Sequence, residues 1–153
     1  PGKPRTVAAA FQQFMPKAVK GAYSRGVGVK RQGEWYFVPA NDVDDDLRIR
    51  SLTVTHGESL PQVDRYMQSI GFTVRKGGVL PLQTPTSNKH ICTRIYEKGS
   101  VRYVVGRVRH DAGRRPSWGS RGDHPMLTLY DGPLYRVYEN KAIRSTSSSG
   151  RVD

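Results

Sequence analysis

Apolar and polar residues alternate with a period of two along four segments in the second half of the chain. This alternation, which is typical of half-buried strands, runs through 91–96, 101–109, 126–130 and 134–138. Turn-forming residues separate the first two segments at 97–100 and the last two at 131–133. We therefore predict four antiparallel strands here, with the first pair and the last pair each joined as a hairpin.

The first half of the chain has a less regular pattern. Aromatic and β-branched residues at 27–30 and 35–38 flank a turn at 31–34, which predicts another hairpin that ends at Pro39. Residues 41–46 are predicted to form an acidic loop, and 47–54 suggest a strand that changes face near Ser51.

Helical spacing of apolar residues is clearest at 60–70. Leu60, Val63, Met67 and Ile70 form one stripe, and Gly71 is suited to the left-handed position that ends a helix. Ser59 and Gln62 have the spacing of a capping box, which should begin the helix.

Weaker signals frame this helix. A shorter helix is expected at 6–15, where Pro16 interrupts the pattern. Residues 77–88, rich in Gly, Pro, Ser and Thr, predict a loop.

These elements predict an α+β fold of antiparallel hairpins and sheet with one or two short helices. The expected domains are a basic N-terminal arm with a short helix at 1–26, a single α+β domain at 27–139 and a flexible, basic, Ser-rich tail at 140–153.

Charge adds a class of partner to this picture. The chain has 25 Lys and Arg against 13 Asp and Glu, a formal charge of +12 in 153 residues, which is typical of proteins that bind nucleic acid. The longest apolar run, 7–11, is too short to cross a bilayer, and no secretory signal is visible, so we expect no membrane partner. A single cysteine forms no internal disulfide, which suits the cytoplasm or a virion or ribonucleoprotein particle.

Alternation also predicts what lies on one face of the C-terminal strands. Gly106 is expected to form a bulge that turns the following arginines outward. A face that mixes cations with aromatic rings suits RNA or single strands more than duplex DNA, although arginines packed over tyrosines on a solvated face would look the same in sequence. The residues predicted on this face are Arg94, Tyr96, Arg107, Arg109, Tyr130, Arg136 and Tyr138.

The segment between two of these strands is a long loop that is rich in Arg and Gly. Trp118 within it has an apolar surface larger than a loop tip usually exposes, so it either packs inward or contacts a partner. We expect Arg114, Arg115, Trp118 and Arg121 to contribute to nucleic-acid binding, with a flexible loop as the alternative.

Two His-Asp pairs bracket that loop and supply the candidate catalytic residues. His110 and Asp111 leave one strand, and Asp123 and His124 enter the next, so pairing of those strands would bring them together. Two imidazoles could cleave RNA by acid–base chemistry or, with the carboxylates, bind a metal ion, or each pair could simply cap the loop. His90 and His56 are further members of this set, and Cys92 is expected to be a buried apolar residue.

Other chemistry finds no support in the sequence. Neither a phosphate-binding Gly-Lys loop nor a dinucleotide fingerprint is present, and the acidic residues at 42–46 lack the spacing of a calcium loop. We therefore expect no cofactor and assign no metal site.

Three functional hypotheses follow. The first is a non-enzymatic nucleic-acid-binding protein that uses the Arg/Tyr face and the Arg/Gly loop. The second is a ribonuclease or toxin-like domain, metal-independent or metal-assisted, that uses His110 and His124. The third is a structural component of a viral or ribonucleoprotein assembly with a protein partner, in which the termini become ordered against their neighbours.

Overall fold

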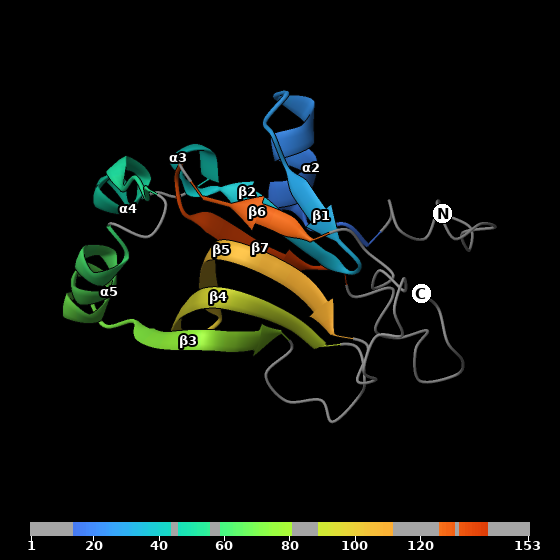
Figure 1. The fold of residues 1–153 in the computed structure, drawn as a ribbon. Coiled ribbons are helices and arrows are strands. Elements are labelled where there is room, and N and C mark those ends of the chain that lie inside the picture. Colours follow the sequence, from blue (N-terminus) through green and yellow to red (C-terminus); the bar gives the residue numbers. More distant parts are fainter. Residues whose placement is uncertain are drawn as a thin grey trace, which may run out of the picture.

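The computed structural model describes residues 14–43, 46–55, 59–80, 89–111, 126–130 and 132–140, and it shows an antiparallel sheet of seven strands with helices packed against it (Figure 1). This arrangement confirms the α+β class. The helices are α2 (Lys17–Ser24), α3 (Ala40–Val43), α4 (Leu47–Ser51) and α5 (Leu60–Ser69). The strands are β1 (Lys30–Gln32), β2 (Trp35–Pro39), β3 (Thr73–Leu80), β4 (Lys89–Lys98), β5 (Val101–Asp111), β6 (Leu127–Leu129) and β7 (Tyr135–Glu139).

The sheet curls until its first strand approaches its middle. The strand order is β1-β2-β7-β5-β4-β3, so β1 and β5 would lie about 14 Å apart in a flat sheet with ~4.8 Å between strands. Instead, the side-chain amide of Gln32 on β1 donates a buried hydrogen bond of 3.1 Å to the carbonyl of Val108 on β5. The curl gives the sheet an inner face and an outer face.

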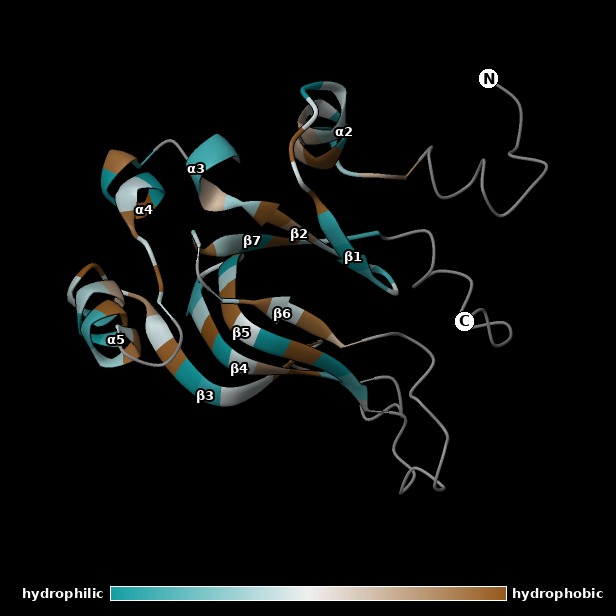
Figure 2. Ribbon diagram, turned by 45° about the horizontal axis from the view of Figure 1, so that its top comes forward, coloured by the Kyte–Doolittle hydropathy of each residue, from teal (hydrophilic) through white to brown (hydrophobic). Residues whose placement is uncertain are grey.

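Side chains from six strands and from no helix fill the inner face. Because only strands contribute to this cluster, it lies in the interior of the curl. Figure 2 shows how apolar and polar positions alternate along the strands. The inner core consists of Trp35, Phe37, Leu80, Cys92, Ile95, Val104, Val108, Leu129 and Val137, with Leu127 and Tyr135 packed against it.

Helices cover much of the outer face in two places. Helices α4 and α5 pack over β4 and β5, where Met67 of α5 and Tyr96 of β4 are both fully buried. Helix α2 packs over β2, where Val19 and Ala22 contact a cluster that includes Tyr36 and Val38. Among the described residues, the outer face is uncovered where neither α2 nor the pair of α4 and α5 lies over the strands.

The predicted hairpin between the last two strands is wrong. Strands β6 and β7 do not pair with each other, because both pair with β5, at Gly106–Val108 and at Tyr103–Val104 respectively. The chain between them turns aside to Gly132, which makes two backbone hydrogen bonds with Val54. Strands β6 and β7 therefore run in the same direction along β5, and the chain is not reversed between them.

Helix α2 corrects the interpretation of Pro16. Proline was expected to interrupt a helix, but here it precedes the first turn and its carbonyl accepts from the amide of Lys20 at 3.0 Å. A helix start suits proline because the amide hydrogen that it lacks would have no partner there. The second half of the predicted basic arm is thus packed against the sheet, while the helix expected at 6–15 falls almost wholly outside the described residues.

The strand predicted at 47–54 is also wrong, because α4 occupies its first half. The Asp46 carboxylate accepts from the amide of Arg48 at 2.9 Å and so caps a short helix. Only Ile49 of that helix is buried, whereas Leu47 is 72% exposed. Apolar residues two apart resembled a strand, but the helix buries one of them and leaves the other in solvent.

Helix α5 confirms the prediction for 60–70 within one residue. Gly71 has the expected positive φ of 97°, and the Phe72 amide donates to the Met67 carbonyl at 2.9 Å. The capping box does not form, since the Ser59 hydroxyl accepts instead from the amide of Thr55.

Strand β3 runs into the segment that was predicted as a loop, of which 81–88 lie outside the described residues. Gly77 takes a φ of 66°, and Gly78 lies so close to β4 that an added Cβ would be 2.8 Å from Ile95 Cδ1. Both glycines therefore serve the strand: one adopts a left-handed conformation and the other permits close packing.

The remaining strand predictions are confirmed with adjusted bounds. The first hairpin turns on Gly33 and Glu34 alone, since Gln32 pairs with Trp35. The bulge predicted at Gly106 is present: its φ is 93°, and the register of β4 against β5 shifts between Cys92 and Arg94.

Candidate functional site

The seven residues predicted to share one sheet face do lie on the outer face, but helices cover most of it. Tyr96 is fully buried beneath α5, and Tyr130 packs against the same cluster. Tyr138 packs against the cluster under α2. The tyrosines were expected to stack on bases, and Tyr96 is inaccessible to any base.

Asp64 on α5 explains why two of these residues serve the fold. Its carboxylate accepts from the Tyr96 hydroxyl at 2.6 Å and forms an ion pair with the Arg94 guanidinium at 3.2 Å. Burial, followed by the hydrogen bond and the charge of Asp64, raises the pKa of Tyr96 well above its usual value. The sequence analysis missed Asp64, although a carboxylate four residues after Leu60, on the apolar side of a helix, signals a buried partner.

Arg107 and Arg109 are the predicted face residues that remain exposed. They lie beyond the helices on β5, and Val108 between them points into the inner core. Thr128, the cross-strand neighbour of Arg107, is exposed, and Ile91, the cross-strand neighbour of Arg109, is half-exposed. We call the region of Val79, Ile91, Arg107, Arg109 and Thr128, which neighbour one another in register, the outer strip.

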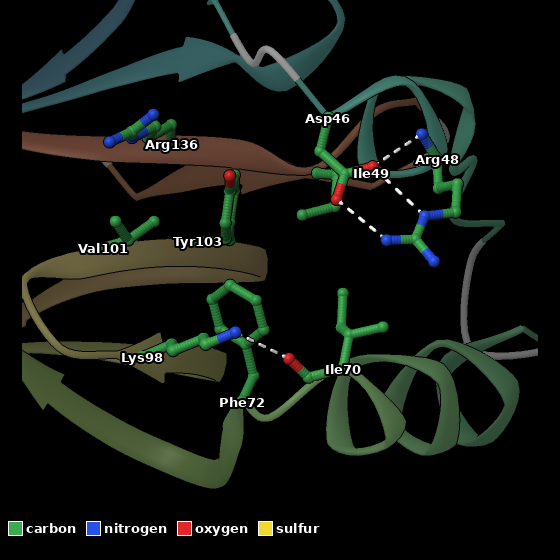
Figure 3. A pocket seen from close by; sticks show the side chains of 9 residues that line it. All are labelled: Asp46, Arg48, Ile49, Ile70, Phe72, Lys98, Val101, Tyr103 and Arg136. Atoms are coloured by element: carbon green, nitrogen blue, oxygen red, sulfur yellow. Dashed lines mark hydrogen bonds and ion pairs between the residues drawn. The ribbon is translucent and has the colours of Figure 1, made fainter.

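Arg136, the last of the predicted residues, lies at a pocket that the sequence analysis did not anticipate (Figure 3). This cavity of about 380 Å³ opens between α4, the end of α5 and the outer side of β4, β5 and β7. Its volume falls within the range of small-molecule sites. The lining residues are Asp46, Arg48, Ile49, Ile70, Phe72, Lys98, Val101, Tyr103 and Arg136.

The pocket has an apolar floor and a cationic rim. The rings of Phe72 and Tyr103 meet edge to face with centroids 5.6 Å apart, and both are almost fully buried. At the rim, the Lys98 ammonium lies 5.8 Å from the Phe72 centroid and donates to the Ile70 carbonyl at 2.9 Å. The Arg136 guanidinium carbon lies 5.6 Å from the centroid of Tyr138. Aromatic contacts and a hydrogen bond thus orient two of the rim cations.

Asp46 is the one acidic residue in the lining. The hydrogen bond from the backbone amide of Arg48 lowers the pKa of Asp46 below its usual value, and the guanidinium of Arg48 lowers it further. Arg48, Lys98 and Arg136 against this carboxylate leave the lining with a net charge of about +2 at neutral pH. The pocket therefore favours an anionic group beside an apolar one.

A second cluster lies at the opposite end of β4 and β5, on the inner face. His90 and His110 are direct cross-strand partners, and their rings lie 4.9 Å apart at an angle of 43°. His90 also pairs with Leu80 of the inner core and is only 1% exposed, whereas His110 is half-buried. The structure thus joins His110 to a histidine that the sequence analysis named only as a further member.

The curl of the sheet brings Glu34 to this histidine pair. Glu34 lies in the turn between β1 and β2, and the electrostatic attraction between its carboxylate and His110 indicates that the two side chains approach each other. Burial raises the pKa of Glu34, repulsion from Glu139 adds to the rise, and attraction to His110 opposes it. The sequence analysis did not find Glu34, because its proximity depends on how far the sheet curls.

No protein-family model matches the chain, and no curated protein or solved structure is significantly similar to it. The function must therefore be argued from the residues themselves.

Several predicted site residues remain untested. Arg114, Arg115, Trp118, Arg121, Asp123, His124 and His56 lie outside the described residues, and Asp111 is the last residue of β5. Within the described ranges, no group of three or more His, Cys, Asp and Glu side chains could hold a metal ion. In the same part of the chain, no helix is both long and apolar enough to span a membrane.

Cys92 confirms its prediction as a buried apolar residue. It belongs to the inner core and is 1% exposed, and burial raises the pKa of its thiol to about 12. The thiol is therefore protonated at neutral pH, which makes it a poor nucleophile.

Proposed function

We propose that the protein binds nucleic acid without chemical conversion, with RNA or single strands preferred over duplex DNA. The observation that carries this proposal is the unequal exposure of the two signs of charge. Of the 16 Lys and Arg side chains whose burial is described, 13 are exposed, whereas of the 6 such acidic side chains only Asp42 is exposed.

The fold itself accounts for this inequality. Asp64 is buried against Arg94, Glu97 pairs with Arg75 and Arg102, and Asp46 caps α4. Because these carboxylates serve ion pairs and a helix terminus, exposed cations outnumber exposed carboxylates among the described residues. Such a surface attracts phosphates, and binding releases the counterions that had surrounded the nucleic acid.

The outer strip is the best-supported place for contact with a strand. Arg107 and Arg109 lie two residues apart on β5, which separates their Cα atoms by about 6.6 Å at the usual rise of a strand. Ile91 and Val79 beside them offer apolar surface for sugars or bases. The strip thus combines charge with apolar contact, without the tyrosine platform that the sequence predicted.

Salt dependence tests the proposal. Binding of a fluorescent single-stranded oligonucleotide should weaken steeply between about 50 and 200 mM salt. The variant with Arg107→Gln and Arg109→Gln should reduce the steepness of the logarithmic salt dependence by about 1.4, since each phosphate contact with a single strand contributes about 0.7. The control carries Arg50→Gln and Arg65→Gln, which remove the same charge from α4 and α5. Absence of binding, or binding that salt does not change, would contradict the proposal. An equal loss in both variants would instead place the contact away from the outer strip.

The contact between His90 and His110 favours a second candidate function, which is metal-independent cleavage of RNA. A base would take the proton of a ribose 2′-hydroxyl, and the 2′-oxygen would attack phosphorus as the bond to the 5′-oxygen breaks. An acid would return a proton to that 5′-oxygen, so the products are a 2′,3′-cyclic phosphate and a 5′-hydroxyl. His110 and Glu34, both half-buried, are the candidates for acid and base, and buried His90 would position His110.

Cleavage assays decide on this candidate. If it is correct, RNA is cut in the presence of a chelator, a 2′-deoxy substitution at the cut site prevents cleavage, and His110→Ala lowers the rate by at least about 100-fold. Glu34→Gln should lower it as well, while Arg65→Gln serves as the unaffected control. This candidate is ruled out if RNA stays intact, or if the His110 and Glu34 variants cut it at the same rate as the unchanged protein.

A further inference from the structure

The pocket of Figure 3 has a composition that matches a nucleotide. Apolar side chains from α4, from β5 and from the segment between α5 and β3, among them Ile49, Val101 and Phe72, line it beneath the cationic rim. A ligand that fills it would place an apolar group against the floor and an anionic group at the rim. A nucleobase joined to a phosphate has these two parts in one unit.

Competing ligands fit less well. Inorganic phosphate would use the rim and leave the apolar floor unfilled, and an uncharged aromatic ring would leave the charge of about +2 unmatched. The volume of about 380 Å³ exceeds what a single ion needs and lies at the lower end of the range for small-molecule sites.

We propose that this pocket binds one nucleotide of a single strand, with the base against Ile70, Phe72 and Val101 and a phosphate at Lys98 and Arg136. The inference rests on the proposed nucleic-acid binding and assigns it a base-sized site separate from the outer strip. A base inside a duplex is stacked and paired on its neighbours and does not reach such a pocket without being flipped out. The pocket would therefore give the protein its preference for single strands.

Two rim cations with matched controls make the test specific. Lys98→Met keeps the alkyl chain and removes the ammonium group, and Lys76→Met makes the same change on exposed β3 outside the pocket. Arg136→Gln is the second pocket variant, with Arg65→Gln on α5 as its control. Binding of adenosine monophosphate, adenosine and inorganic phosphate is measured by calorimetry for each protein.

The expected result is that adenosine monophosphate binds more tightly than either of its parts alone. Each pocket variant should weaken that binding by about 10- to 100-fold, as the loss of a charged hydrogen bond does, and the controls should not. The pocket variants should also reduce the ratio of single-strand to duplex affinity in oligonucleotide binding.

Failure of this inference is distinguishable from failure of the proposed function. If oligonucleotides bind with a steep salt dependence but adenosine monophosphate does not bind, or binds equally to pocket and control variants, the pocket assignment is overturned and nucleic-acid binding stands. If no oligonucleotide binds at any salt concentration, the proposed function falls and the assignment of a strand to the pocket falls with it.

Discussion

Replacing Asp64 by alanine is expected to lower the free energy of unfolding by about 3 to 5 kcal/mol, the largest effect that we predict. The change leaves the Tyr96 hydroxyl, which is fully buried, without its 2.6 Å acceptor. It also leaves the Arg94 guanidinium, whose side chain is 17% exposed, as a mostly buried charge without its carboxylate. Urea or guanidinium denaturation of the two proteins measures the difference.

A surface control separates this effect from the general loss of a negative charge. Asp42→Ala removes an exposed carboxylate from α3 and should change stability by less than about 0.5 kcal/mol. Tyr96→Phe deletes one hydrogen bond to a charged carboxylate but keeps the ring and the ion pair, so it should cost about 1.5 to 3 kcal/mol. If Asp64→Ala were as harmless as Asp42→Ala, the buried network would not hold α5 to the sheet.

Gly106→Ala is expected to cost about 3 kcal/mol, for two separate reasons. The positive φ of 93° is unfavourable for any residue with a Cβ, which accounts for about 1 to 2 kcal/mol. In addition, the new Cβ would clash with Thr93 Cβ, and Thr93 is itself fixed because its hydroxyl accepts from the amide of Arg107.

The control for this substitution is Gly99→Ala in the hairpin between β4 and β5. Gly99 also has a positive φ, of 60°, but nothing lies within 4 Å of an added Cβ, so this change should carry only the backbone cost. Thermal or denaturant unfolding of both variants isolates the steric part. Equal losses in the two proteins would mean that β4 moves aside to accept the methyl group at Gly106.

Sequence patterns predicted the local elements with the strongest periodicity. Helix α5 and strands β4 and β5 were predicted from the apolar residues at 60–70, 91–96 and 101–109, and the structure confirms them. Helix α4 spans only five residues, so its spacing cannot distinguish a helix from a strand, and the Asp46 cap decides. For β3, the paired glycines resembled a loop signal, although one of them allows close packing against Ile95.

Prediction of the candidate site from the sequence was limited for a different reason. Alternation correctly placed Arg94, Tyr96 and Arg136 on one face, because the side-chain period of a strand is local information. Whether that face meets solvent depends on where α2 and α5 pack, and the histidine cluster depends on the curl that brings Glu34 to β5. The packing of these helices and the curl of the sheet both depend on contacts between residues far apart in the sequence, which a short window of sequence does not contain. The outward position of Arg107 and Arg109 was foreseen, and the pocket was not.

The position of β7 in the sheet has a consequence for synthesis on the ribosome. Among the described strands β7 comes last in the chain, yet it lies between β2 and β5 and alone joins the β1–β2 hairpin to the unit of β3, β4 and β5. Until residues 135–139 emerge, the two parts of the sheet have no backbone pairing with each other, and the inner core remains open along that edge. A nascent chain that stalls before β7 would thus expose Trp35 and Phe37 to chaperones or to aggregation.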